Sequence, residues 1–123
     1  MGRDEMIQSK EFHPDNMEWI EIFDEHMKKT IYDKRLVQPE DTDTGMMINF
    51  SKYPAGYYKT FHKHHCAHGI YVMKGILRTD KGEYGPGNFV WHPEGLSARH
   101  GATENEDCEF LFITNKPFDI YYE

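Results

Sequence analysis

The sequence has few cysteines, no long apolar run and no excess of positive charge. Its 123 residues include two cysteines, Cys66 and Cys108, too few for a disulfide framework or a paired-cysteine metal motif, so we expect free thiols. No apolar stretch approaches the ~20 residues that a bilayer crossing needs, which argues against a membrane-spanning helix. The net charge of −7 would repel a phosphate backbone, so we expect no nucleic-acid partner.

The first residues carry no recognisable targeting signal. The start, MGRDE, lacks the apolar core of a signal peptide, and Met6 stands where a myristoylation motif needs Ser or Thr. We therefore expect a cytoplasmic protein. The length fits one domain, and the polar start predicts a flexible N-terminal segment over residues 1–15 followed by a folded domain over 16–123.

The pattern of apolar residues indicates an all-β fold. From residue 46 onward, short runs rich in branched and aromatic residues alternate with Gly- and Pro-containing turns, which is typical of an antiparallel sandwich or barrel. Residues 38–45 form an acidic, turn-rich connection. Residues 19–23 predict a first strand, although 18–32 also fits a helix, and the pattern alone leaves both open. The expected later strands contain residues 46–50, 70–73, 76–77, 89–91, 110–113 and 120–122.

Four of the eight histidines have the arrangement that a metal site needs. His62 and His64 lie two residues apart, so on a strand both rings project from one face with their Cα atoms about 6.5 Å apart. That separation lets two imidazoles approach one ion at about 2.0–2.1 Å. His68 must come from the following turn or strand and His100 from a distant one. These four histidines are therefore candidate ligands of a single metal ion.

The histidines lie within a segment that resembles a known motif. Residues 56–75, GYYKTFHKHHCAHGIYVMKG, are similar to the first motif of the cupins, with His68 where that family usually has a glutamate. Residues 87–95, GNFVWHPEG, match the glycine and proline frame of the second motif. In the family, the histidine of this motif falls at the position that Ala98 occupies here. In this sequence the histidine comes two residues later, at His100. The resemblance covers about residues 46–122 and implies a double-stranded β-helix, a small jelly-roll barrel that holds one divalent metal.

Other side chains compete for a role in the site. His92 is the alternative to His100, although its position is usually not a ligand in the family, and thiolate ligation by Cys66 is less favoured. His65 points away from its neighbours and is expected to be solvated or to lie behind the ligands. His13 and His26 are interpreted as surface residues, and Glu83 as a solvated turn residue.

The metal shell implied by the resemblance has a distinct chemistry. Four neutral imidazoles cancel none of the charge of a divalent cation, so the site should be a strong Lewis acid that prefers an anionic, chelating organic ligand. Imidazole ligands favour Fe(II) or Zn, with Ni, Cu or Mn as alternatives, over Mg or Ca. By strand alternation and aromatic content, we expect the substrate-binding residues to be Tyr58, Thr60, Ile70, Val72, Phe110 and Phe112.

Residues 84–95 point to one branch of the cupins. They resemble the branch with the cupin domain of zinc-dependent anti-sigma factors, acetylacetone-cleaving dioxygenases and 2,4'-dihydroxyacetophenone dioxygenase. We do not expect the anti-sigma role, because no helical sigma-binding region precedes the expected barrel. The resemblance implies a homodimer and a non-haem dioxygenase that cleaves a carbon–carbon bond in an enolisable dicarbonyl or hydroxy-ketone. The alternatives are a non-redox lyase, isomerase or cyclase, and a non-catalytic domain that binds metal or a small ligand.

Overall fold

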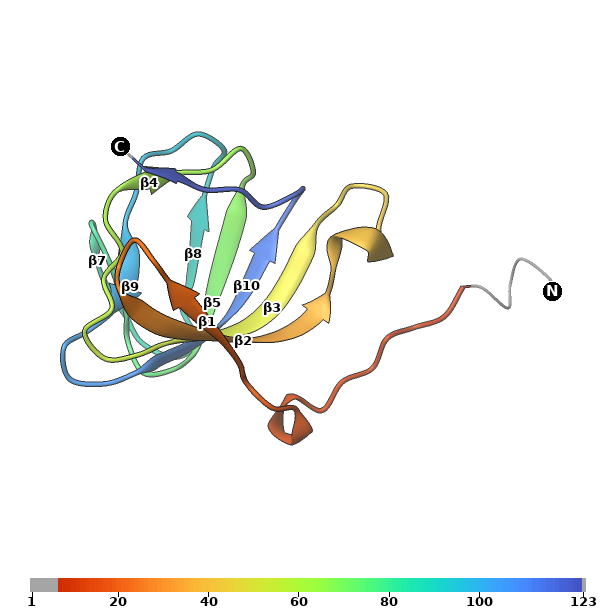
Figure 1. Ribbon diagram of the computed structural model, residues 1–123, viewed down its shortest axis with the longest axis horizontal. Coiled ribbons are helices and arrows are strands. Elements are labelled where there is room, and N and C mark those ends of the chain that lie inside the picture. The colour runs from red at the N-terminus through yellow and green to blue at the C-terminus, as the bar shows by residue number, and fades with distance from the viewer. Residues whose placement is uncertain (1–6, 123) are drawn as a thin grey trace.

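The strands lie in three antiparallel sheets that curve around one interior (Figure 1). The structure is a computed structural model and describes residues 7–122. In chain order the elements are η2 (Pro14–Asn16), β1 (Ile20–Asp24), β2 (Lys29–Val37), η3 (Pro39–Asp41), β3 (Met47–Tyr53), β4 (His62–Lys63), β5 (His68–Lys74), β6 (Leu77–Thr79), β7 (Gly82–Tyr84), β8 (Phe89–His92), β9 (His100–Ala102), β10 (Cys108–Thr114) and β11 (Tyr121–Tyr122).

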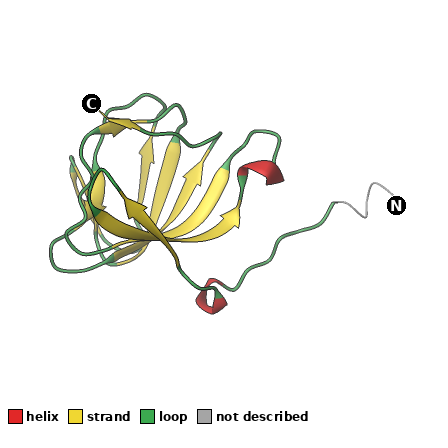
Figure 2. Cartoon of the chain, viewed as in Figure 1, coloured by secondary structure: helices red, strands yellow, loops and turns green. Residues whose placement is uncertain are grey.

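One large sheet forms most of the barrel wall. Its six strands run in the order β1-β2-β3-β10-β5-β8, and a three-stranded sheet, β7-β6-β9, and the pair β11-β4 complete the enclosure. Every pairing is antiparallel. Helix in the described chain is limited to two short turns (Figure 2). The prediction of an antiparallel all-β fold is therefore confirmed.

The N-terminal part forms a hairpin and not a helix. Strands β1 and β2 pair in register from Ile20↔Asp33 to Asp24↔Lys29, and Lys28 adopts the left-handed conformation (φ 57°) in the turn between them. The strand expected over 19–23 is thus present, and the helix that 18–32 also allowed is not. The acidic connection contains η3, where Gln38 and Asp41 cap each other's backbone.

Strand alternation determines which side chains of the sheets face the interior. In β10 the buried and half-buried residues alternate without a break, which places Phe110 and Phe112 inside. The two cysteines are free thiols, as expected, and both are buried. The hydrophobic core contains Tyr53, Tyr57, Ile70, Val72, Leu77, Ala102, Cys108, Phe110 and Phe112.

The described segment before β1 is hydrogen-bonded to strand β2. The predicted flexible segment 1–15 includes residues 1–6, which are outside the described residues. The part that follows is held by two lysines: Lys34 Nζ donates to the Pro14 carbonyl at 2.7 Å, and Lys10 Nζ donates to that of Leu36 at 3.1 Å. Within residues 7–122, no helix combines the length and the apolar character needed to span a bilayer.

Two turn glycines give a test of the packing that closes the barrel. Gly75 and Gly87 both have positive φ (77° and 88°), but an added Cβ at Gly75 would lie 2.0 Å from the Asp107 carbonyl oxygen, whereas at Gly87 it would meet nothing within 4 Å. Each Ala substitution should cost about 1–2 kcal/mol for the backbone conformation. We expect Gly75→Ala to cost at least about 2 kcal/mol more, because the backbone must move. Urea denaturation measures the difference, and equal losses would contradict the packing described here.

Candidate metal centre

Four buried histidines from separate segments meet inside the barrel. His62 begins β4, His64 follows its end, His68 begins β5 and His100 begins β9, and each is at most 4% exposed. The ring centroids of His62 and His64 are 4.9 Å apart, and those of His64 and His68 are 4.7 Å apart. His100 lies 5.0 Å from His62 and 5.7 Å from His68. The structure therefore brings together the four residues named from the sequence.

The four histidine rings fall into two overlapping groups that could each hold an ion. One ring nitrogen each from His62, His64 and His100 lie within 4.8 Å of one another, close enough to share an ion. His68 instead belongs to a second such group with His92 and His100. His92, the sequence alternative to His100, is buried as well, and its Nδ1 lies 2.9 Å from His68 Nε2. His92 is thus a neighbour of the cluster, on the side of His68.

Unpartnered nitrogens show that the cluster fits a metal. His64 Nε2, His68 Nδ1 and His100 Nε2 are buried and have no hydrogen-bond partner. Buried polar atoms are nearly always satisfied, because losing their water costs several kcal/mol otherwise. A divalent transition metal would satisfy these nitrogens, and an all-imidazole donor set suits Zn, Fe, Ni or Cu. On this observation the residues present fit such an ion.

The opposite ring nitrogens are held by oxygens from the surrounding chain. His62 Nδ1 lies 2.7 Å from the Thr60 carbonyl, and His64 Nδ1 contacts the Asp119 carbonyl. A carbonyl accepts only, so in both rings Nδ1–H donates and Nε2 is left with its lone pair. His100 Nδ1 lies 3.0 Å from the Tyr53 hydroxyl, which can accept the same kind of bond. These contacts fix the ring orientations before any ion arrives.

Burial keeps the cluster neutral. Loss of solvent lowers the pKa of His62 to about 4 and that of His68 to about 2, and it lowers the pKa of His100 well below its usual value. Neighbouring imidazoles add to the effect, since two charged rings at this distance would repel. The folded protein therefore presents unprotonated rings at neutral pH, which is the form that binds metals.

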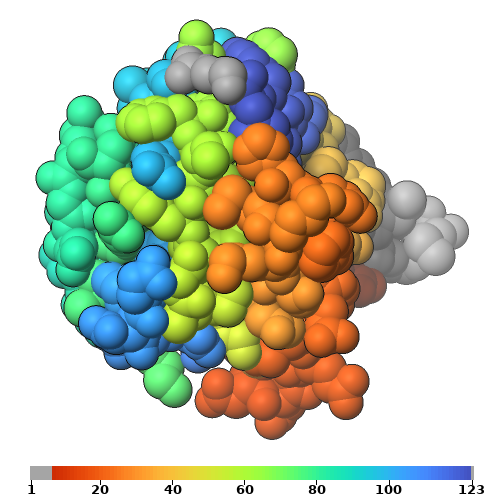
Figure 3. All heavy atoms as spheres, turned by 60° about the vertical axis from the view of Figure 1, so that its left-hand side comes forward, coloured from red at the N-terminus to blue at the C-terminus, as the bar shows by residue number. Residues whose placement is uncertain are grey.

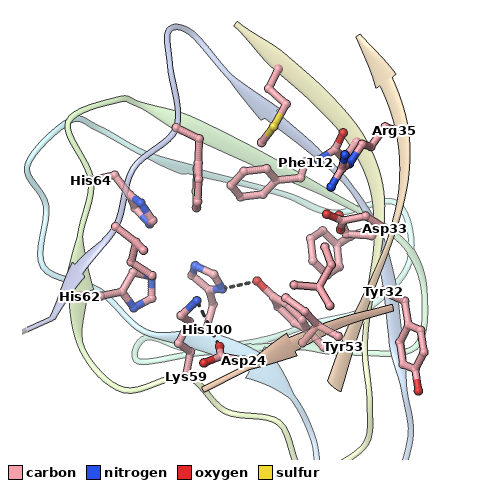
Figure 4. Close-up of a pocket in the computed structure, with 18 of the residues that line it drawn as sticks. Asp24, Tyr32, Asp33, Arg35, Tyr53, Lys59, His62, His64, His100 and Phe112 are labelled. Carbon is pink, nitrogen blue, oxygen red and sulfur yellow. Dashed lines mark hydrogen bonds and ion pairs between the residues drawn. The ribbon is translucent and has the colours of Figure 1, made fainter. Parts of the chain in front are cut away.

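A cavity of about 590 Å³ opens from the histidines into the barrel. Its lining includes His62, His64 and His100 on one side, and Asp33 and Arg35 on the opposite side (Figure 4). Aromatic rings, among them Phe110, Phe112 and Phe118, line it as well. Of the residues expected to bind substrate, Phe110 and Phe112 line this cavity, whereas Tyr58, Thr60, Ile70 and Val72 do not.

The four residues outside the cavity have other environments. The Tyr58 ring is in contact with the guanidinium groups of Arg78 and Arg99, which lie 4.2 and 3.6 Å from its centroid. The Thr60 side chain is exposed, and only its carbonyl serves the site, through His62. Ile70 and Val72 are fully buried in the hydrophobic core.

The displacement of Tyr58 and Thr60 has a simple physical cause. Strand β4 contains only His62 and Lys63, so the two-residue alternation does not extend back along the chain. Gly56, with φ of 82°, turns the backbone, and Tyr57 becomes the buried residue in place of Tyr58.

Sequence reasoning missed an ion pair at the histidine end of the cavity. Lys59 Nζ lies 3.4 Å from Asp24 Oδ2, with the two side chains 13% and 8% exposed. The Tyr57 hydroxyl donates to the same oxygen at 2.7 Å. Figure 3 shows why no sequence signal pointed to this pair: the orange β1–β2 hairpin lies against the yellow-green segment around residue 60, a contact between elements far apart in the chain.

The sequence predicted the strand at 120–122, but not that the segment containing it crosses the end of the barrel and contacts the histidines. We call residues 115–122 the C-terminal strap. It starts where Asn115 N donates to the Ala67 carbonyl at 3.1 Å, and it ends with β11 paired to β4. Its Asp119 carbonyl holds His64, and its Phe118 and Tyr122 line the cavity.

The other candidate residues lie outside the cluster. His13 and Glu83 are exposed, as expected. His65 is exposed and pairs with the Asp119 carboxylate. His26 is exposed, as expected, and its Nε2 lies 2.7 Å from Thr60 Oγ1 while its ring stacks on Tyr122 at 3.6 Å. Cys66 is fully buried, and burial raises the pKa of its thiol, which disfavours the thiolate form.

Solved structures with the same architecture come from several bacteria. The polyketide cyclase RemF from Streptomyces resistomycificus matches with a TM-score of 0.73 and 16% identity over 94% of this chain and 88% of that one. A putative acetylacetone dioxygenase from Methylibium petroleiphilum PM1 matches with a TM-score of 0.76 and 15% identity over 94% and 83%. The anti-sigma factor ChrR of Rhodobacter sphaeroides, solved with SigE, matches with 0.64 and 18% over 83% and 51%. At these identities the likeness shows the fold, which is that of the cupins.

The sequence itself carries the family assignment. No curated protein matches the chain. The sequence model of the ChrR cupin-like domain, however, matches residues 8–119, which is nearly the whole chain and includes all four clustered histidines. The expected resemblance to this branch is therefore confirmed, and the chain belongs to the ChrR cupin-like family.

Proposed function

We propose that this protein is a metal-dependent enzyme whose ion is bound by His62, His64, His68 and His100. The observation that carries the proposal is the set of buried ring nitrogens without partners, on His64, His68 and His100, in a cluster that borders a cavity. His68 is included because its Nδ1 lacks a partner and its ring lies 4.7 Å from that of His64. Fe(II) or Zn is the proposed metal, with Ni, Cu or Mn as alternatives.

The proposed reaction is the cleavage by dioxygen of a carbon–carbon bond in an enolisable dicarbonyl or hydroxy-ketone. When bound, the metal supplies Lewis acidity at the histidine end of the cavity. The chain contributes a neutral set of ligands, which leaves the charge of the cation available to an anionic substrate. The rings of Phe110, Phe112 and Phe118 enclose the apolar part of the substrate and exclude water.

A second candidate is a non-redox cyclase, lyase or isomerase at the same site. Two structural relatives carry names that refer to carbonyl compounds, a polyketide cyclase and a putative acetylacetone dioxygenase, and each covers 94% of this chain. The first name favours chemistry without oxygen and the second favours an oxygenase. A non-catalytic ligand-binding domain is the third reading. A homodimer is also part of our proposal, and the exposed Phe89 and Trp91 on edge strand β8 are apolar surface that would support it.

Metal binding should stabilise the protein through His62. We expect Zn at 100 times its Kd to add about 2.7 kcal/mol to the free energy of unfolding of the chelator-treated protein. In His62→Ala this gain should be lost, because a nitrogen of the converging set is removed. The matched control is His13→Ala, an exposed histidine outside the cluster, which should keep the full gain. Calorimetric unfolding with and without Zn measures this gain in the free energy of unfolding. Equal gains in the two variants would contradict the assignment of His62 as a ligand.

Replacing His68 by the carboxylate usual in cupins tests the charge argument. We expect His68→Glu to retain Zn, since a carboxylate is also a ligand, but to bind oxalate at least tenfold more weakly than the native Zn protein. The added negative charge lies within a few ångströms of the ligand and opposes it. His13→Glu introduces the same charge at an exposed histidine outside the cluster and should leave oxalate affinity almost unchanged. Titration calorimetry gives both values, and unaltered oxalate binding by His68→Glu would count against the proposed shell.

Oxygen uptake separates the two proposed reactions. Fe-loaded protein supplied with a panel of 1,3-diketones and hydroxy-ketones should consume dioxygen if the oxygenase proposal holds. Turnover of the same compounds by Zn-loaded protein without oxygen would instead select the non-redox candidate. An electrode and product analysis provide the readouts. Absence of turnover in both conditions, together with tight metal binding, would leave the non-catalytic reading.

A further inference from the structure

The ion pair between Lys59 and Asp24 lies where a ligand of the metal site would end. Both residues line the cavity together with His62 and His100, and Figure 4 shows the pair beside His100. The charge of Lys59 is close enough to contribute to the lowered pKa of both His62 and His100. A group bound at the histidines would therefore meet this ammonium as well.

The surrounding residues fix Asp24 more firmly than they engage Lys59. Asp24 accepts the Tyr57 hydroxyl at 2.7 Å through Oδ2 and the Met27 backbone N–H at 3.0 Å through Oδ1. Burial opposes the ionisation of Asp24, yet these bonds and Lys59 hold its pKa below the usual value. The Lys59 ammonium, in contrast, has one carboxylate oxygen at 3.4 Å and the Tyr122 ring centroid at 5.7 Å, and the carboxylate oxygen can occupy only one of its three N–H donors.

Keeping the Lys59 ammonium charged at this largely buried position costs free energy. Burial lowers the pKa of Lys59, and Asp24 only partly offsets that loss. An ammonium held against desolvation, with donors to spare and a cavity in front of it, is suited to bind an anion. Arg35 is the other basic side chain, besides the histidines, that lines the cavity, but it is exposed and lies near Asp33 on the opposite side.

We propose that Lys59 is a specificity-determining residue that binds an anionic oxygen of the ligand, a carboxylate or an enolate, while Asp24 and Tyr57 position it. The ligand is then a small organic anion whose charged end lies between Lys59 and the histidines and whose apolar body packs on Phe110 and Phe112. This inference deepens the proposed function and rests on it for the orientation of the ligand. It does not require that the metal itself be correctly assigned.

The test compares a charged ligand with its neutral counterpart in protein freed of metal by a chelator. The probes are phenylacetate and phenylacetamide, which share size and ring and differ in charge. We expect the native protein to bind phenylacetate at least about tenfold more tightly than phenylacetamide, because only phenylacetate forms a charge-assisted hydrogen bond with Lys59. Lys59→Gln should bind the two compounds equally, whereas Lys59→Arg should keep the preference. Titration calorimetry or ligand-observed NMR supplies the affinities.

Arg35→Gln is the matched control, because it removes the other basic side chain of the same cavity. It should keep the preference for phenylacetate. Loss of the preference in Arg35→Gln but not in Lys59→Gln would overturn the proposal, and so would a native protein that binds both probes equally or neither. Zn titration of Lys59→Gln separates the two claims: unchanged Zn affinity with lost anion preference supports Lys59 independently of the metal assignment.

Discussion

The removal of five imidazoles from water is the constraint on which the site depends. His62, His64, His68, His92 and His100 are all buried, and burial lowers the pKa of each. A barrel that only needed to fill its interior would do so more favourably with apolar side chains, because each unpartnered ring nitrogen costs free energy. Among the buried side chains described, unpartnered polar atoms occur only in this histidine cluster.

Residues around the histidines orient the rings, so that defined nitrogens are available to a metal. Backbone carbonyls of Thr60 and Asp119 take the outer nitrogens of His62 and His64, so their inner nitrogens face the cavity. Tyr53 does the same for His100 and stacks on Tyr57, whose hydroxyl holds Asp24. The histidines and the Lys59–Asp24 pair are therefore connected through two tyrosines of the core. These outer contacts set the geometry of the ligands and are as much a part of the site as the ligands themselves.

The sequence predicted the elements that depend on local patterns. Strands such as β10 follow from clean alternation, and the histidine cluster follows from spacing together with the family motif. The predictions for Tyr58 and Thr60 relied on alternation through a segment that turns at Gly56, and local spacing cannot show where a strand ends. The strand at 120–122 was expected, but the roles of Lys59, Asp24 and the C-terminal strap in the site were missed, because they depend on contacts between distant segments. Such contacts exist only once the barrel has closed, so no window of the sequence contains them.

The central claim is that imidazoles from separate segments share one ion inside the barrel. Crystals of protein purified without chelators, measured on both sides of the absorption edge of the metal found by elemental analysis, test it most directly. We expect a single anomalous peak within about 2.0–2.2 Å of the Nε2 atoms of His62, His64 and His100, with His68 turned toward it. A peak elsewhere on the chain, or four ordered histidines with water alone between them, would contradict the account.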